Sequence, residues 1–280
     1  MESVISSRLA ILGHPQRLAI LRLLIRRYPD RLPAGEIAEA LALKASTLSA
    51  YLAALMQVGL VTQERAGTSL LYAPDMSAVR GTFDYLLLEC CRGRPDLCPP
   101  SGQLPALGES GMTDRPFRVL FVCTGNSARS IFAECLLRDL GGDRFEVHSA
   151  GTRPRSELHP FAVRVLQDKG HDVSSLRAKN VAEYQGPDAV PFDFVFTVCN
   201  RAANEDCPPW RGQPVSGHWG MPDPVRAEGT EAERALAFQE VYGALRNRIA
   251  AFVALPLREL DALSLQGAVD ALGRTKESTE

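Results

Sequence analysis

The chain has 280 residues, of which 45% are hydrophobic and 23% are charged, and its formal net charge is −2. This length favours roughly two domains, and the composition excludes a disordered chain and is typical of a folded, soluble protein. Residues 1–98 carry eleven Lys/Arg against nine Asp/Glu, or +2, and the remainder carries twenty against twenty-four, or −4. Charge alone therefore gives no argument for nucleic-acid binding.

The sequence predicts neither a signal peptide nor a membrane span. The first twelve residues lack a basic stretch followed by an apolar core, and no apolar run approaches the roughly 18–20 residues that span a bilayer. We therefore expect a soluble cytoplasmic protein. Its seven cysteines would then be mostly reduced, and we interpret them as reactive or ligand thiols rather than as a disulfide framework.

Helical periodicity dominates residues 1–98. A helix is predicted to begin at Pro15, a residue that suits the first turn, with an apolar face toward the core and a basic face toward solvent. The apolar positions are Leu18, Leu21, Leu24 and Ile25, and the basic positions are Arg22, Arg26 and Arg27. The pattern then predicts helices over 35–41, from about Ser46 and over 77–91, and a hairpin with strands 61–65 and 69–72.

Residues 99–115 are rich in Pro, Gly and Ser and show no periodicity, so they are predicted to be a linker. Strands and helices alternate after it. The predicted strands are 117–123, 145–149 and 192–199, and the predicted helices are 131–139, 160–169 and 231–254. This alternation favours an α/β domain over 116–258, with a parallel sheet between helices on both faces. Residues 259–280 are interpreted as a C-terminal extension.

The strongest motif is Cys-Thr-Gly-Asn-Ser-Ala-Arg-Ser, residues 123–130, between a predicted strand and a predicted helix. Such a loop directs backbone N–H groups at an anion. Gly125 would allow a close approach of the backbone, and Arg129 would offer forked donors to an oxyanion. We expect these groups to lower the pKa of Cys123 and keep it a nucleophilic thiolate. The expected oxyanion-binding residues are Thr124, Gly125, Asn126, Ser127, Ala128, Arg129 and Ser130.

With this loop near their start, residues 116–255 resemble the low-molecular-weight protein tyrosine phosphatase family. In that family an Asp-Pro pair on a later loop supplies the general acid. The resemblance gives this role to Asp223, within His-Trp-Gly-Met-Pro-Asp-Pro at 218–224, which would protonate the departing oxygen. A lone Asp-Pro is more often an ordinary turn, but its order and setting in the chain favour the functional interpretation.

Two further cysteines, Cys199 and Cys207, bear on the chemistry. A phosphatase needs one cysteine, whereas reduction of arsenate needs a second thiol to take part in a disulfide and can use a third to carry it to the surface. The arrangement resembles the thioredoxin-coupled arsenate reductases. That resemblance implies that Cys123 attacks arsenate, Cys199 releases arsenite, and a Cys199–Cys207 disulfide is reduced by thioredoxin or a similar thiol reductant. Two inert thiols are the alternative, and Cys135 is expected to be a buried core residue.

Residues 8–90 resemble the ArsR/SmtB family of winged-helix repressors through segments 12–24, 34–61 and 64–72. The resemblance implies that the second helix of the helix-turn-helix lies in the major groove of an operator, and that the chain dimerises through its terminal helices. The residues expected to contact DNA are Lys44, Ser46, Thr47, Ser49, Tyr51 and Arg65.

Many members of that family sense arsenic or metals through cysteines before the recognition helix, and residues 32–41 contain none. Three other cysteines, Cys90, Cys91 and Cys98, lie within nine residues. Three thiolates suit arsenite, and some arsenite-responsive members are similar in this respect. The alternative is that Cys90 or Cys91 packs as a small hydrophobe in the dimer interface.

The two halves together indicate an arsenic-resistance protein that is both an arsenite-responsive repressor and an arsenate reductase. We expect no permanently bound cofactor, with arsenite as the inducer. Two alternatives stay open. One is a DNA-binding regulator fused to a low-molecular-weight protein tyrosine phosphatase, and the other is a regulator that binds an oxyanion without turnover.

Overall fold

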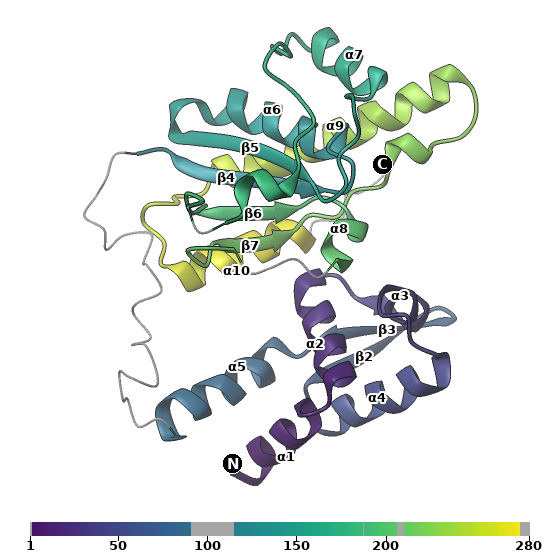
Figure 1. Ribbon diagram of the computed structural model, residues 1–280, viewed down its shortest axis with the longest axis vertical. Coiled ribbons are helices and arrows are strands. Elements are labelled where there is room, and N and C mark those ends of the chain that lie inside the picture. Colours follow the sequence, from purple (N-terminus) through teal and green to yellow (C-terminus); the bar gives the residue numbers. More distant parts are fainter. Residues whose placement is uncertain (1, 91–114, 187, 206–209, 275–280) are drawn as a thin grey trace. The chain divides into compact units, whose positions relative to one another are not determined.

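The computed structural model describes residues 2–90, 115–186, 188–205 and 210–274, without the side chains of Leu88 and Cys90. The chain divides into two compact units, residues 1–103 and 104–280. The first is mainly helical and the second contains a parallel sheet (Figure 1). Within the described ranges, no helix is long and apolar enough to cross a membrane.

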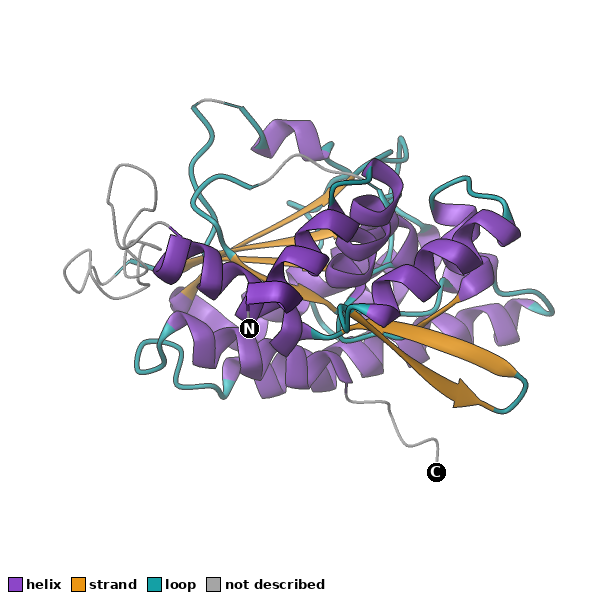
Figure 2. Ribbon diagram, turned by 90° about the horizontal axis from the view of Figure 1, so that it is seen from below, coloured by secondary structure: helices purple, strands orange, loops and turns teal. Residues whose placement is uncertain are grey.

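The first unit has the helix-turn-helix and the hairpin expected from the sequence. Its helices are α1 (Glu2–Leu12), α2 (Pro15–Arg27), α3 (Ala34–Ala40), α4 (Ala45–Gln57) and α5 (Met76–Tyr85), which continues into a π-helical turn, Leu86–Cys90. Its strands β1 (Leu32–Pro33), β2 (Val61–Ala66) and β3 (Ser69–Pro74) form an antiparallel sheet in the order β1-β3-β2. The β2–β3 hairpin extends away from the helices (Figure 2).

One face of α2 differs from the prediction. Ile20, Leu23 and Leu24 are fully buried, whereas Leu18 is 42% exposed. Arg27, which was expected to face solvent, is only 2% exposed, because it lies seven residues after Ile20 and so on the same face of the helix. Its guanidinium contacts Glu36 of α3 and Asp30, which neutralise its charge. The prediction for Arg27 was wrong because an arginine is buried only where carboxylates pair with it, and both of its carboxylate partners lie outside α2.

The second unit confirms the predicted α/β domain. Its parallel sheet consists of β4 (Phe117–Cys123), β5 (Phe145–Gly151), β6 (Phe194–Thr197) and β7 (Val215–His218), in the order β5-β4-β6-β7. Its α-helices are α6 (Arg129–Gly141), α7 (Pro160–Asp168), α8 (Asn200–Asn204), α9 (Glu231–Val253) and α10 (Ala262–Arg274). Three short 3₁₀ helices are η2 (Gly142–Arg144), η3 (Val181–Tyr184) and η4 (Pro224–Arg226). The sequence predicted neither β7 nor α10.

An aromatic cluster forms the core on one face of this sheet. Phe121 and Phe196 are paired on neighbouring strands, and Trp219 stacks on Phe196 with ring centroids 4.0 Å apart. Phe252 of α9 packs edge-on against Phe196 at 5.2 Å. Aromatic pairs of this kind add to the free energy gained by burying the rings. The opposite face is covered in part by η3, whose Tyr184 contacts His148 of β5.

The topology places several loops at one edge of the sheet. The strands are parallel, so their carboxyl ends meet there, which is where sites form in open α/β sheets. Cys123 is the last residue of β4, Cys199 follows β6 by two residues, and the segment to Asp223 follows β7. These three segments form the candidate site.

Candidate active site

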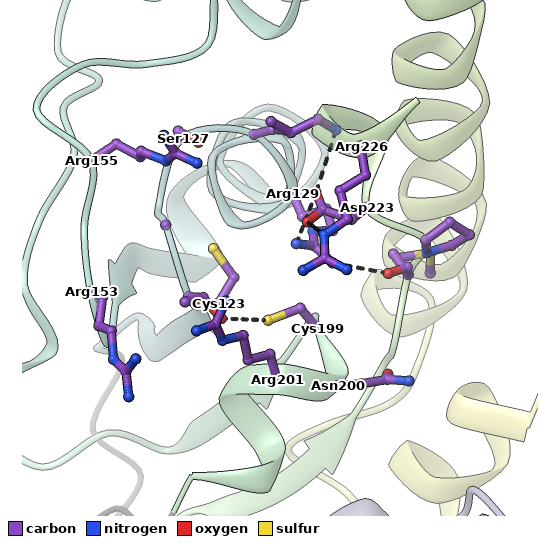
Figure 3. A pocket seen from close by; sticks show the side chains of 16 residues that line it. Cys123, Ser127, Arg129, Arg153, Arg155, Cys199, Asn200, Arg201, Asp223 and Arg226 are labelled. Atoms are coloured by element: carbon purple, nitrogen blue, oxygen red, sulfur yellow. Dashed lines mark hydrogen bonds and ion pairs between the residues drawn. The ribbon is translucent and has the colours of Figure 1, made fainter. Parts of the chain in front are cut away.

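A cavity of about 510 Å³ opens at the carboxyl edge of the sheet (Figure 3). Residues from the segment between β4 and the start of α6, the loop after β5, the start of α8 and the segment from Met221 through η4 line it. They are Cys123, Thr124, Gly125, Ser127, Ala128, Arg129, Arg153, Arg155, Cys199, Asn200, Arg201, Met221, Pro222, Asp223, Val225 and Arg226. The structure thus brings together Cys123, Arg129, Asp223 and Cys199, four of the five residues predicted to be catalytic.

The loop between β4 and α6 curls around the sulfur of Cys123. The backbone N–H of Asn126 donates a hydrogen bond to Cys123 Sγ at 3.1 Å, and Ser130 Oγ lies 2.9 Å from the same sulfur. In the described part of the chain, the backbone N–H groups of Gly125, Ser127 and Ala128 donate no hydrogen bond. Because these groups belong to cavity-lining residues at the start of a helix, they are available to an anion.

Asn126 shapes the loop from behind. Its φ of +44° lies in the left-handed region, which asparagine tolerates better than most residues. Its side-chain amide donates to Ser130 Oγ at 2.9 Å and Ser149 Oγ at 2.7 Å, and its carbonyl accepts the N–H of Lys179 at 2.6 Å. Asn126 and Ser130 were predicted to bind the oxyanion, but both are fully buried and do not line the cavity. Their side chains position the loop instead.

A buried ion pair supports this network. Lys179 Nζ lies 2.8 Å from Glu134 of α6, and Ser149 donates a hydrogen bond to the same carboxylate. Both charged side chains are nearly buried. This pair could not be predicted from the sequence, since 45 residues separate its members.

The loop between β4 and α6, residues 123–130, is called the nucleophile loop. The loop after β5 contacts it on its other side. Backbone N–H groups of Arg153 and Arg155 donate to the carbonyls of Thr124 and Gly125, each at 2.9 Å. At Gly151 an added Cβ would lie 2.6 Å from the carbonyl oxygen of Thr124, so this close approach requires glycine.

Gly125 was predicted to let the backbone approach a bound anion closely. Against the protein itself, an added Cβ there would lie 3.4 Å from Arg155 Cγ, at the edge of ordinary contact, and the φ of Gly125 is not positive. The packing of the two loops therefore requires glycine at Gly151, and the role of Gly125 toward an anion stays a prediction.

Arg129 and Asp223 are paired at the cavity wall. Arg129 Nη2 lies 3.1 Å from Asp223 Oδ1, and its Nη1 donates to the carbonyl of Met221 at 3.1 Å. Asp223 is also the N-cap of η4, where it accepts the N–H of Val225, and Arg226 lies 3.8 Å from its second oxygen. A guanidinium and a carboxylate therefore face the same space as the Cys123 sulfur (Figure 3).

The net pKa shift at Cys123 is opposite to the predicted one. Burial raises the pKa of the Cys123 thiol above its usual value, and the charge of Cys199 raises it further. The hydroxyl of Ser130, the charge of Arg129 and the N–H of Asn126 act in the lowering direction but are outweighed. The prediction was wrong because it counted the donors around the sulfur and not its desolvation.

Cys199 lies next to the nucleophile loop. Its side chain is 1% exposed, and its Sγ is 3.4 Å from Thr124 Oγ1. As the N-cap of α8 it also accepts the N–H of Ala202 at 3.4 Å. Cys207, the third cysteine of the predicted relay, lies outside the described residues.

Cys135 is buried in the core, as expected, and burial raises its pKa to about 11. Its sulfur lies within 4.8 Å of possible ligand atoms of Asp139 and His171. Arg138 Nη2 is 3.4 Å from the same sulfur and supplies positive charge at this place.

Sequence reasoning missed five cavity residues with polar side chains, Arg153, Arg155, Asn200, Arg201 and Arg226. A signal was available for the first two, because they follow directly on a strand whose carboxyl end meets that of β4. Asn200 and Arg201 directly follow Cys199, and any role of Cys199 in the site would bring them to the cavity.

The residues predicted to contact DNA are placed around α4 and the hairpin. Lys44, Ser46 and Ser49 are exposed at the start of α4, and Thr47 is half-buried. Arg65 is exposed in β2, where its Nε donates to the Gly67 carbonyl at 3.2 Å.

Tyr51 differs from the other predicted contacts. It is half-buried, and its hydroxyl lies 3.4 Å from His14 Nε2 at the start of α2. The side chain of Cys90 and all of Cys91 and Cys98 lie outside the described residues.

Comparisons with known proteins agree with this geometry. Residues 118–263 match a family model described as low molecular weight phosphotyrosine protein phosphatase, and residues 12–64 match one described as a helix-turn-helix domain. The chain is 37% identical over 134 residues to an arsenate reductase of Bacillus subtilis (strain 168), a match that covers 48% of this chain and 93% of that protein.

Two further matches are to arsenate reductases, one over about half of this chain and one over a larger part of it. A glutaredoxin arsenate reductase of Synechocystis sp. is 29% identical over 137 residues, which cover 49% of this chain and 96% of that protein. A solved structure of a thioredoxin-dependent arsenate reductase of Corynebacterium glutamicum is 22% identical, with a TM-score of 0.36, and the match covers 76% of this chain and 91% of that chain.

Proposed function

The chain belongs to the low molecular weight phosphotyrosine protein phosphatase family. We propose that its second unit reduces arsenate to arsenite. We further propose that its first unit binds operator DNA as an arsenite-responsive repressor. The identity of 37% to an arsenate reductase over nearly the full length of that protein supports the enzymatic half. The helix-turn-helix match over residues 12–64 supports the DNA-binding half.

The observation that carries the reductase proposal is that two cysteines line one cavity. Cys123 is surrounded by the anion-binding loop, and Cys199 lies across Thr124 from it. Hydrolysis of a phosphate ester needs only the first thiol, because water completes that reaction. A second thiol beside the first supplies the other half of the electron pair that arsenic must receive.

In the first step Cys123 attacks arsenate, a sulfur–arsenic bond forms, and one arsenate oxygen leaves as water with the thiol proton. Asp223 faces this space and would relay that proton to the leaving oxygen. Arg129 would balance the charge on the remaining oxygens with its forked donors.

In the second step Cys199 attacks the sulfur of Cys123. The sulfur–arsenic bond breaks, arsenic keeps the electron pair and leaves as arsenite, and the two thiols become a disulfide. In the third step Cys207 attacks Cys199, which frees Cys123 and gives a Cys199–Cys207 disulfide. Thioredoxin or a similar dithiol reductant then reduces that disulfide and is itself oxidised.

The test is arsenate-dependent oxidation of NADPH in the presence of thioredoxin and its reductase. We expect turnover in the wild type and loss of turnover in both Cys123→Ser and Cys199→Ser, with Cys135→Ser as the matched control that retains it. A parallel assay with glutaredoxin and glutathione distinguishes the two reductants. Absence of arsenate turnover in the wild type, together with release of phosphate from an aryl phosphate, would overturn the reductase proposal in favour of a phosphatase.

For the first unit, we propose that exposed residues at the start of α4 contact base edges and phosphates in the major groove, with Arg65 of the hairpin on the flanking backbone. A homodimer formed through this unit would contact two half-sites. Arsenite bound by Cys90, Cys91 and Cys98 would release the DNA.

The test of the repressor proposal is binding to DNA selected from a random-sequence pool, with and without arsenite. We expect release of DNA by arsenite in the wild type and no release when the three cysteines are replaced by serine. Failure of the wild type to bind any selected DNA would contradict it.

A further inference from the structure

Four arginines outside the nucleophile loop line the cavity. Arg226 approaches Asp223 within the site, and the other three lie around its mouth. Arg153 and Arg155 come from the loop after β5, and Arg201 comes from α8 (Figure 3). All three are exposed, and the side chain of Arg153 is 67% exposed. By contrast the side chain of Arg129, inside the cavity, is only 12% exposed.

The backbone fixes these three residues relative to the two thiols. The N–H groups of Arg153 and Arg155 are hydrogen-bonded to the carbonyls of Thr124 and Gly125, next to Cys123. Arg201 lies in α8, two residues after Cys199, which is the N-cap of that helix. The backbone positions that carry these positive charges are therefore fixed relative to Cys123 and Cys199.

Acidic groups of the unit neutralise little of this charge. Arg153 is 3.6 Å from Glu205, at the long end of the range for an ion pair. Across the described residues, neither Arg155 nor Arg201 forms an ion pair. Asp223, the carboxylate of the cavity, is engaged by Arg129 and approached by Arg226.

The burial of Arg129 and the exposure of the other three indicate different roles. A tetrahedral anion held by the loop and Arg129 would be enclosed, whereas the other three arginines line the same cavity with exposed side chains. Charges placed in this way act on a large, charged partner that approaches the mouth.

We propose that Arg153, Arg155 and Arg201 form a docking surface for an acidic face of the dithiol protein that reduces the Cys199 disulfide. This proposal rests on the proposed relay: Cys199, which would form the disulfide, is the N-cap of α8, so a reductant that reaches its sulfur must approach the helix that contains Arg201. A thiolate of the reductant attacks the disulfide, which frees one thiol of this chain and forms a mixed disulfide through the other. The second thiol of the reductant then attacks the mixed disulfide, frees the other thiol of this chain and leaves the reductant oxidised. Electrostatic attraction raises the rate of this encounter more than it raises the affinity of the final complex.

The test compares a double variant, Arg155→Ser with Arg201→Ser, with a control of the same charge change away from the mouth, Arg164→Ser with Arg177→Ser. The side chains of Arg164 and Arg177 are exposed and paired with Glu231 and Glu183. Steady-state rates are measured against thioredoxin concentration at saturating arsenate, and against arsenate concentration at saturating thioredoxin.

We expect the KM for thioredoxin to rise by about tenfold in the mouth variant, a typical electrostatic effect on association, and to stay near the wild-type value in the control. The wild-type kcat/KM for thioredoxin should fall as salt is added, and the mouth variant should show a weaker dependence. A rise in the KM for arsenate without a rise in that for thioredoxin would overturn the proposal and assign the arginines to substrate capture. Equal behaviour of the mouth and control variants would also overturn it.

Turnover driven by dithiothreitol, a neutral reductant, separates this proposal from the one on which it rests. If the wild type reduces arsenate with dithiothreitol and the mouth variant shows no defect specific to thioredoxin, the docking surface is wrong and the relay stands. If the wild type reduces no arsenate with either reductant, the relay itself is wrong.

Discussion

The thiols of Cys123 and Cys199 line one cavity, and the charge of Cys199 raises the pKa of Cys123. The Cys123 thiolate is therefore disfavoured by its neighbour as well as by burial, and removal of the Cys199 sulfur should make that thiolate easier to form.

At this scale we predict that Cys199→Ser lowers the pKa of Cys123, because it removes the second largest of the effects that raise it. Ser130→Ala should shift the pKa upward, because the hydroxyl of Ser130 stabilises the thiolate. The measurement is the rate of alkylation of Cys123 by iodoacetamide as a function of pH, quantified by mass spectrometry of the peptide that contains it. An unchanged or higher pKa in Cys199→Ser would contradict the coupling.

A second prediction concerns the buried pair behind the loop. Lys179→Met leaves the Glu134 carboxylate without its cation, and removal of one member of a buried pair costs about 3–5 kcal/mol. The double variant with Glu134→Gln should cost less, because no buried charge is left unpaired. Both tryptophans, Trp210 and Trp219, belong to the second unit, so their fluorescence during urea unfolding reports on this unit. A double variant that is less stable than Lys179→Met would show the prediction to be wrong.

Residues of the site could be predicted from the sequence where they belong to one continuous sequence motif. Cys123 and Arg129 stand in one eight-residue motif between a strand and a helix, and Asp223 stands before a proline in a recognisable order. Lys179 and Glu134 could not be predicted, because each alone has the character of a surface residue and only the fold brings them to 2.8 Å. The direction of the Cys123 pKa shift was missed for a similar reason, since burial is a property of the folded chain.

Among the elements, β4 and α9 were predicted nearly to the residue. β4 is a short, nearly continuous apolar run of seven residues, and α9 is a long amphipathic helix of twenty-three residues. β7 has only four residues and includes Gly217, and glycine weakens the strand signal. α10 was missed because it lies beyond the segment that the resemblance covered, although its Leu265 and Val269 are fully buried.

The contact between β7 and α10 gives a prediction at the scale of elements. A Cβ at Gly217 would lie 2.6 Å from Val269 Cγ1 and 3.0 Å from Phe196 Cδ1. Gly217→Ala should therefore destabilise the second unit by about 1–3 kcal/mol through overpacking. Adding Val269→Ala should restore part of this loss, because it removes the atom that the new methyl meets.

The measurement is again tryptophan fluorescence during urea unfolding, since Trp219 donates a hydrogen bond to the Val269 carbonyl at 3.4 Å. Gly243→Ala in α9 is the control: nothing lies within 4 Å of its added Cβ, and alanine favours a helix. Equal losses in the single variant Gly217→Ala and the double variant would contradict the proposed contact.

At the scale of the whole molecule, the product of one unit is the proposed ligand of the other. We predict that arsenate alone leaves the protein on its DNA, and that arsenate with thioredoxin, its reductase and NADPH releases it. Added arsenite should release DNA from both the wild type and Cys123→Ser, whereas arsenate with the reducing system should release only the wild type. Fluorescence anisotropy of a labelled DNA fragment measures this. Release of Cys123→Ser by arsenate with the reducing system would contradict the link between turnover and induction.

The nucleophile loop is held on every side by the protein itself, through Asn126, Ser130, the N–H groups of the loop after β5 and the buried pair. A loop fixed in this way selects an oxyanion by its shape and charge, and phosphate and arsenate differ little in either property. Phosphate should therefore occupy this loop as a competitor, and the two anions would be sorted after binding rather than during it. Only the arsenic adduct can accept an electron pair from two sulfurs. The neighbouring thiol of Cys199 would therefore discriminate between the two anions, because it converts bound arsenate irreversibly to arsenite whereas phosphate only binds and dissociates.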